Sequence, residues 1–131
     1  MAAADLQQVL IVDDEELVRH FVDRTLRGAG YRTTLAPSGV AALELASTAP
    51  AFDLLLTDLM MPSMRGDELA RRMRVAFPDL KVLYLTGFAD ALFQSRPLLW
   101  DNETFVEKPV TGRALLEAVS MALFGHTRGP E

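Results

Sequence analysis

The chain has 131 residues, half of them apolar, and a formal net charge of −5. This length suits one domain, which we expect to span 1–131 with its core at about 7–123. The acidic balance argues against direct nucleic-acid binding, which requires clustered cations. The one local basic cluster is predicted to be a solvated helix face made by Arg71, Arg72 and Arg74.

Neither a membrane segment nor a signal peptide is evident. No apolar run approaches the ~20 residues that a membrane helix needs. The N-terminal residues lack the basic and apolar regions of a secretory signal, and the chain contains no cysteine. We therefore expect a cytoplasmic protein without disulfides or membrane contact, present as a monomer or weak dimer.

Short apolar runs alternate with helical patterns along the chain. Five runs predict strands at 7–12, 31–35, 53–57, 81–85 and 104–107. Helices are predicted at 15–28, 38–48, 66–75, 89–100 and 111–124, with Ser38 and Thr111 as N-caps and Gly125 as the final stop. Pro97 weakens the fourth helix. We expect the first helix to have one apolar side, formed by Leu17, Val18, Phe21, Val22 and Leu26.

Five alternations of strand and helix predict an α/β fold with a doubly wound parallel sheet covered by helices on both faces. The runs 7–12, 53–57 and 81–85 are continuously apolar, as in strands buried on both faces. The second and fifth strands are more polar and suit the edges. The strand order 2-1-3-4-5 follows, with a topological switch point between strands 1 and 3.

Polar residues follow the strands at one edge of this sheet. Asp13 and Asp14 follow the first strand, Asp58 ends the third, Thr86 follows the fourth and Lys108 follows the fifth. Three close carboxylates raise each other's pKa values, and a divalent cation such as Mg²⁺ relieves that repulsion. With a lysine and a hydroxyl, they form a set suited to phosphoryl transfer.

Each of these residues also has a plainer interpretation. A lone aspartate after a strand is usually a turn or cap residue, and the acidic run at 13–16 can simply match a helix dipole. Lys108 can be a surface charge before a proline. The histidines, His20 and His126, lack neighbours suited to metal binding and are expected to be solvated. The polar residues that follow the strands are all expected at one edge of the sheet, and this joint placement favours a functional site over the separate plainer interpretations.

Four motifs carry a resemblance to a known family: "VLIVDDEE" at 9–16, "LLLTDLMMPSMRGDEL" at 54–69, "YLTG" at 84–87 and "FVEKP" at 105–109. The sequence resembles the receiver domain of two-component response regulators, with spacings that agree over most of the chain. Some motifs resemble receivers attached to hybrid sensor kinases. The resemblance implies a flavodoxin-like fold.

The resemblance implies that Asp58 accepts a phosphoryl group from a histidine kinase or a histidine phosphotransfer protein. It further implies that Asp14, Asp58 and the backbone carbonyl of Met60 ligate Mg²⁺, for which Mn²⁺ can substitute. Asp13 would act mainly through a water molecule.

The resemblance also implies a switch. Lys108 would neutralise a phosphoryl oxygen, and Thr86 would move toward the phosphoryl group once it is present. Phe105 occupies the family's switch-aromatic position, where relatives often have tyrosine, so its signal would travel by packing alone. Phe105 can alternatively be a core residue of an edge strand. The implied output face combines the fourth helix, fifth strand and fifth helix and would bind an unknown downstream protein.

Two apolar residues stand where the family tunes the lifetime of the phosphoryl group. They are Met60 and Phe88, and neither can orient an attacking water by hydrogen bonding. We expect slow self-dephosphorylation; the alternative is that both residues only cover the pocket. The apolar residues 98–100, just after Pro97, are either a repacked core edge or a contact for a partner.

Three functions are compared. A receiver switch, not an enzyme beyond the turnover of its own phosphoryl group, fits best. A haloacid-dehalogenase-like phosphatase would want a second aspartate where Met60 stands. A degenerate receiver used as a scaffold would have lost one of Asp13, Asp14, Asp58 or Lys108, and all are present. Whether the chain is a stand-alone regulator or the receiver of a longer protein stays open.

Overall fold

The computed structural model describes residues 7–48, 51–87 and 103–125. Its elements in chain order are β1 (Gln8–Val12), α1 (Glu16–Gly28), β2 (Arg32–Ala36), α2 (Gly39–Thr48), β3 (Leu54–Asp58), α3 (Gly66–Ala76), β4 (Lys81–Thr86), β5 (Glu103–Glu107) and α5 (Gly112–Phe124). The predicted helix at 89–100, with Phe88, Pro97 and His126, lies outside the described residues.

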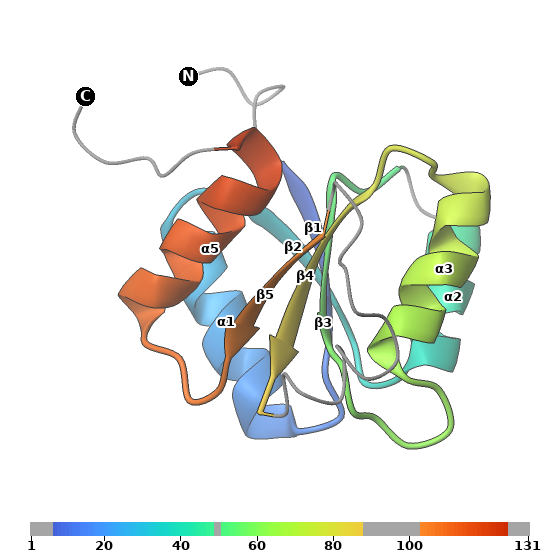
Figure 1. Cartoon of the computed structure of the whole chain (residues 1–131), viewed down its shortest axis with the longest axis horizontal. Coiled ribbons are helices and arrows are strands. Elements are labelled where there is room, and N and C mark those ends of the chain that lie inside the picture. Colours follow the sequence, from blue (N-terminus) through green and yellow to red (C-terminus); the bar gives the residue numbers. More distant parts are fainter. Residues whose placement is uncertain (1–6, 49–50, 88–102, 126–131) are drawn as a thin grey trace.

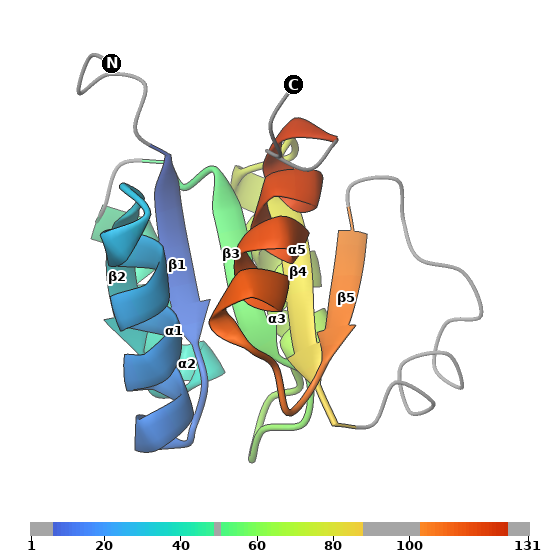
Figure 2. The same cartoon turned by 90° about the vertical axis from the view of Figure 1, so that its left-hand side faces the viewer.

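The strands form one parallel sheet in the order β2-β1-β3-β4-β5. Helices α1 and α5 cover one face, and α2 and α3 cover the other (Figure 1). Figure 2, turned by 90°, shows α1 and α5 lying in front of the strands. The predicted doubly wound architecture and strand order are confirmed.

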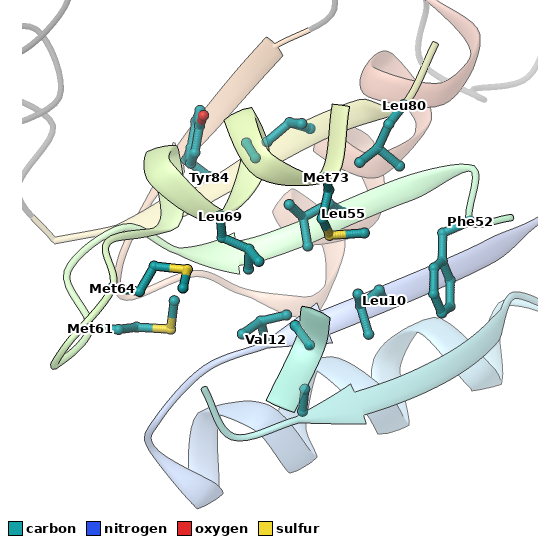
Figure 3. Close-up of a cluster of buried hydrophobic side chains, with 14 of the residues drawn as sticks. Leu10, Val12, Phe52, Leu55, Met61, Met64, Leu69, Met73, Leu80 and Tyr84 are labelled. Carbon is teal, nitrogen blue, oxygen red and sulfur yellow. The ribbon is translucent and has the colours of Figure 1, made fainter. Parts of the chain in front are cut away.

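The three central strands are buried on both faces. Residues alternate between two core clusters: Leu10, Leu55 and Tyr84 belong to the cluster on the side of α2 and α3, which Figure 3 shows in close-up. Ile11 and Leu56 belong to the cluster beneath α1 and α5. Because successive side chains of a strand point to opposite faces, burial of both faces requires the continuous apolar runs seen in the sequence.

The helix ends follow the predicted chemistry. The Ser38 hydroxyl accepts from the Ala41 N–H at 3.1 Å, and the Thr111 hydroxyl accepts from the Ala114 N–H at 3.0 Å. Gly125 ends α5 in the left-handed region at φ 77°. The cap at Thr111 fixes the start of α5 directly after the loop that follows β5. None of the described helices is long and apolar enough to cross a membrane.

The apolar side predicted for α1 is only partly correct. Val22 and Leu26 are buried, but Leu17 is 86% exposed and Phe21 is 39% exposed. Val18, Val22 and Leu26 form the stripe that meets the sheet, and residues one position away lie about 100° around the helix. Leu17 and Phe21 therefore stand at the edge of the helix–sheet contact.

The predicted solvated face of α3 is also partly wrong. Arg71 and Arg72 contact Glu68 at the surface, as expected. The Arg74 guanidinium instead turns inward and lies 2.9 Å from Glu103, whose side chain is 0% exposed. The Tyr84 hydroxyl donates to the same Glu103 oxygen at 2.8 Å. A buried charge needs such partners, and this network ties α3 to β4 and β5.

Candidate functional site

The carboxyl ends of β1 and β3 bring three aspartates together. Val12 pairs with Thr57 in the parallel register, so Asp13 and Asp58 emerge side by side at the switch point. Each of Asp13, Asp14 and Asp58 offers a carboxylate oxygen within 4.8 Å of the others. Asp13 and Asp58 are buried, whereas Asp14 is exposed. The sequence-predicted cluster is therefore one local site.

Lys108 reaches into this cluster from the loop after β5. Its Nζ lies 3.4 Å from an Asp13 oxygen and 3.5 Å from an Asp58 oxygen. The Lys108 backbone N–H donates to the Thr86 carbonyl at 2.9 Å, which fixes the start of the loop against the end of β4. A Glu15 carboxylate oxygen lies 3.4 Å from the same Nζ. Glu15 was not among the residues predicted for this site, although it belongs to the acidic run at 13–16.

Burial shapes the titration of the site. It raises the pKa of Asp58 from 3.8 to about 6, and the neighbouring Asp13 charge adds to the shift, while Lys108 and the Met60 N–H oppose it. Burial likewise raises the pKa of Asp13 against the opposing Glu15 N–H and Lys108. Burial works to lower the pKa of Lys108, but the charges of Asp13 and Asp58 outweigh it and raise the pKa. The charges of Asp13, Asp58 and Lys108 therefore affect one another's pKa values, and the Lys108 ammonium offsets part of the repulsion between the two carboxylates.

The donor set of this cluster suits a hard divalent cation. Among the described residues, Oδ2 of Asp13 is a buried side-chain oxygen without a hydrogen-bond partner, and the Lys108 ammonium forms an ion pair with it at 3.4 Å. Mg²⁺ takes oxygen ligands, usually one or two carboxylates with other oxygens. The three carboxylates of Asp13, Asp14 and Asp58 therefore fit such an ion by chemical type and by spacing.

The loop after β3 is anchored so that Asp58 is held firmly. Leu59 and Met61 are buried, whereas Met60 between them is 43% exposed. The Met60 backbone N–H works to lower the pKa of the Asp58 carboxyl. A Cβ added at Gly66 would overlap the Asp58 carbonyl oxygen, so only glycine permits this approach of α3 to the end of β3.

Thr86 and Phe105 lie on one face of neighbouring strands. Asp58, the last residue of β3, pairs with Leu85, which puts Thr86 one residue beyond the end of β3. Tyr84 pairs with Phe105, and Thr86, two residues on, shares the face of Tyr84. Thr86 is fully buried, and Phe105 is partly buried against the cluster beside α2 and α3.

An apolar groove adjoins the aspartate cluster. It is lined mainly by Leu17, Val18 and Phe21 of α1 and by Lys108, Pro109 and Val110 after β5. Lys108 belongs to both the groove and the cluster, so the two features are continuous. The sequence did not predict this groove, because it depends on the exposure of Leu17 and Phe21.

Comparisons with known proteins agree on one family. A sequence model described as the response regulator receiver domain matches residues 9–120. The response regulator receiver protein CpdR of Brucella abortus is 43% identical over 84 residues, which cover 64% of this chain and 69% of that protein. The sensor kinase CckA of the same organism is 36% identical over 117 residues, covering 88% of this chain but 12% of the kinase.

Solved structures lead to the same result. The receiver domain of the hybrid histidine kinase CckA superposes with a TM-score of 0.75 at 31% identity, covering 88% of this chain and 98% of that one. The chemotaxis response regulator CheY4 of Vibrio cholerae gives a TM-score of 0.78 at 31% identity, covering 90% and 99%. The chain is thus similar both to a chemotaxis regulator and to one segment of a sensor kinase.

Proposed function

The chain belongs to the response regulator receiver domain family, and on this premise we propose that Asp58 is the phospho-acceptor of a two-component phosphorelay. Receivers of this family are signalling switches, and phosphorylation is their input. The observation that carries the assignment is the position of Asp58: buried at the switch point, beside Asp13, with the Lys108 ammonium 3.5 Å away.

The donor we propose is the phosphohistidine of a histidine kinase or phosphotransfer protein. An Asp58 oxygen forms a bond to phosphorus while the phosphorus–nitrogen bond breaks, and the electron pair returns to the imidazole. Asp58 must be ionised to attack, and its pKa of about 6 leaves it mostly ionised at pH 7. The Lys108 ammonium is close enough to neutralise an oxygen of the incoming group.

We assign the metal site of this family to Asp14, Asp58 and the Met60 carbonyl as direct ligands, with Asp13 acting through a water. The spacing of the carboxylates and the buried Asp13 Oδ2, which accepts no hydrogen bond among the described residues, support this assignment. Mg²⁺, or Mn²⁺ in its place, would neutralise negative charge on the carboxylates and the phosphoryl oxygens when bound.

The switch we propose begins at Thr86. Phosphorylation replaces one negative charge by about two and adds acceptor oxygens. The Thr86 hydroxyl then turns toward the phosphoryl group, and Phe105 packs into the space that it leaves. Thr86 lies on β4 and Phe105 on β5, and the direct pairing of these two strands in the sheet supports this coupling. The face that includes β5 and α5 would carry the change to an unknown downstream protein.

The groove beside Lys108 is the surface on which we expect the phosphohistidine donor to dock. Asp58 is only 6% exposed, so the donor must approach through the mouth of the site. Leu17 and Phe21 project beside that mouth and offer apolar contact area of the kind found at the centre of protein interfaces.

Met60 and Phe88 are expected to prolong the life of the phosphoryl group, since neither orients a water molecule. The change Met60→Asn introduces such a group and should shorten the lifetime, as should Phe88→Glu. Equal lifetimes in the native protein and both variants would contradict this expectation.

The proposed function is tested by incubation with acetyl phosphate and Mg²⁺, followed by intact-mass measurement. The native protein should gain the mass of one phosphoryl group, and Asp58→Ala should not. A native protein without an adduct would point instead to a scaffold that does not depend on phosphorylation.

A further inference from the structure

Arg65, which precedes α3, has no part in the phosphoryl chemistry described above. Its Nε and Nη2 lie 3.1 and 3.3 Å from the two carboxylate oxygens of Asp67. The remaining nitrogen, Nη1, donates to the Met60 sulfur at 3.4 Å. Met60 lies two residues after Asp58, so the contacts from Asp67 through Arg65 end at a side chain close in the chain to the proposed acceptor.

Partial burial indicates that the Arg65–Asp67 pair is restrained, and Arg65 contacts the Met60 sulfur at the exposed surface of the loop. The Asp67 side chain is 17% exposed and that of Arg65 is 34% exposed, so their two-bond contact is partly shielded from water. Met60 is 43% exposed, whereas Asp58 is 6% exposed. A methionine has three rotatable bonds and, when unrestrained, spreads over many rotamers. The Arg65 contact favours the rotamers that keep the thioether near the loop.

We propose that Arg65, held by Asp67, is a positioning residue that keeps the Met60 side chain at the mouth of the acceptor site and thereby slows hydrolysis of the Asp58 phosphoryl group. This inference rests on the proposed function of Asp58. In the hydrolysis, a water oxygen bonds to phosphorus and the bond from phosphorus to the Asp58 oxygen breaks. Orthophosphate leaves with the protons of the water, and the carboxylate is regenerated.

The physical reason is exclusion of water. A thioether is at most a weak hydrogen-bond acceptor and cannot take a proton from an attacking water. Under this proposal, a Met60 side chain held in one place occupies space that the water needs. Without the Arg65 contact, the Met60 side chain leaves that space open for part of the time. The rate of hydrolysis then rises with the fraction of time for which the space is open.

The test compares decay rates. The native protein and Arg65→Ala are phosphorylated with acetyl phosphate and Mg²⁺, the donor is removed by desalting, and the mass adduct is followed over time. Arg65→Ala should decay about threefold faster, the scale set by one weak hydrogen bond. Arg65→Lys should also decay faster, because an ammonium cannot make the two-bond contact and reach Met60 together. First-order decay does not depend on how much protein was labelled.

Two controls separate positioning from charge. Arg72→Ala removes the same charge from α3, the helix that Arg65 precedes, where Arg72 pairs with Glu68 at 2.8 Å; this variant should decay at the native rate. In a Met60→Ala background, Arg65→Ala should cause no further acceleration, because the side chain that it positions is gone. Thermal unfolding of each variant verifies that it is folded.

The outcomes are distinct. A native decay rate in Arg65→Ala overturns the inference. Acceleration by the same factor in the Met60→Ala background overturns it too, since Arg65 would then act without Met60. If the native protein gains no adduct that depends on Asp58, the proposed function fails, and this inference fails with it.

Discussion

Asp58 is a carboxylate placed where ionisation is unfavourable. Its folded-state pKa of about 6 lies above the ordinary value of 3.8, so the folded protein holds a proton more tightly than the unfolded chain does. Stability therefore falls as the pH rises from about 4 to 6, and the loss persists at pH 7. The fold accepts this cost at the position of the proposed phospho-acceptor.

The first prediction concerns this residue. Asp58→Asn removes the buried charge and should raise the free energy of unfolding by about 1–2 kcal/mol in metal-free buffer at pH 7. The gain should shrink as the pH falls from 7 to 5, because the native carboxyl is then protonated. Thermal or urea unfolding of both proteins at several pH values measures this. An Asp58→Asn protein that is less stable than the native one at pH 7 would contradict the account.

At the scale of elements, α3 is tied to the sheet by a buried ion pair rather than by apolar packing alone. Glu103 begins β5, an edge strand, and its buried carboxylate accepts hydrogen bonds from Arg74 and Tyr84. Both partners lie on the face that also holds Phe105, next to Tyr84 in the register. This network therefore fixes the surroundings of the proposed switch aromatic.

The second prediction follows from that network. Arg74→Met removes the guanidinium that pairs with the buried Glu103 carboxylate and should lower the free energy of unfolding by about 3–5 kcal/mol. Arg72→Met is the matched control, because its pair with Glu68 is exposed and should contribute less than about 1 kcal/mol. Urea unfolding measures both variants. A similar loss of unfolding free energy in the two would contradict the larger contribution predicted for the buried pair.

At the scale of the whole molecule, the sheet and its reactive edge follow from local patterns, but the surfaces do not. The apolar runs 53–57 and 81–85 predicted central strands because burial on both faces leaves no room for alternation, and the strand order then brought Asp13 and Asp58 together. The burial of Glu103 and the exposure of Leu17 depend on how the helices pack against the sheet. The pattern of apolar residues within one segment does not determine that packing.

The Arg65 contact illustrates the same limit. Its partner Met60 lies five residues away across a loop, and their approach depends on the path that the buried Leu59 and Met61 impose on the chain. The sequence predicted Met60 as a neighbour of the acceptor, but not which side chain would hold it. Loop geometry of this kind is decided by packing.

The third prediction concerns the docking surface. Leu17→Ser with Phe21→Ser removes apolar area from the groove while leaving the aspartate cluster intact. Transfer from a phosphorylated kinase or phosphotransfer protein that labels the native chain should slow at least tenfold, a loss of about 1.4 kcal/mol. Labelling by acetyl phosphate should not change, because this small donor needs no docking surface.

The control for this surface is Val75→Ser. Val75 is 83% exposed on α3, on the other side of the sheet, and its loss should leave both donors unaffected. If the double variant loses labelling by acetyl phosphate as well, the groove supports the site itself, and the docking assignment is wrong.

The most direct test of the central claim identifies the phosphorylated residue itself. The protein is labelled with acetyl phosphate and Mg²⁺ and reduced with borohydride, which converts an aspartyl phosphate to homoserine, and its peptides are then sequenced by mass spectrometry. The account predicts homoserine at position 58 and nowhere else. Homoserine at position 13 or 14, or an unmodified Asp58 in labelled protein, would contradict it.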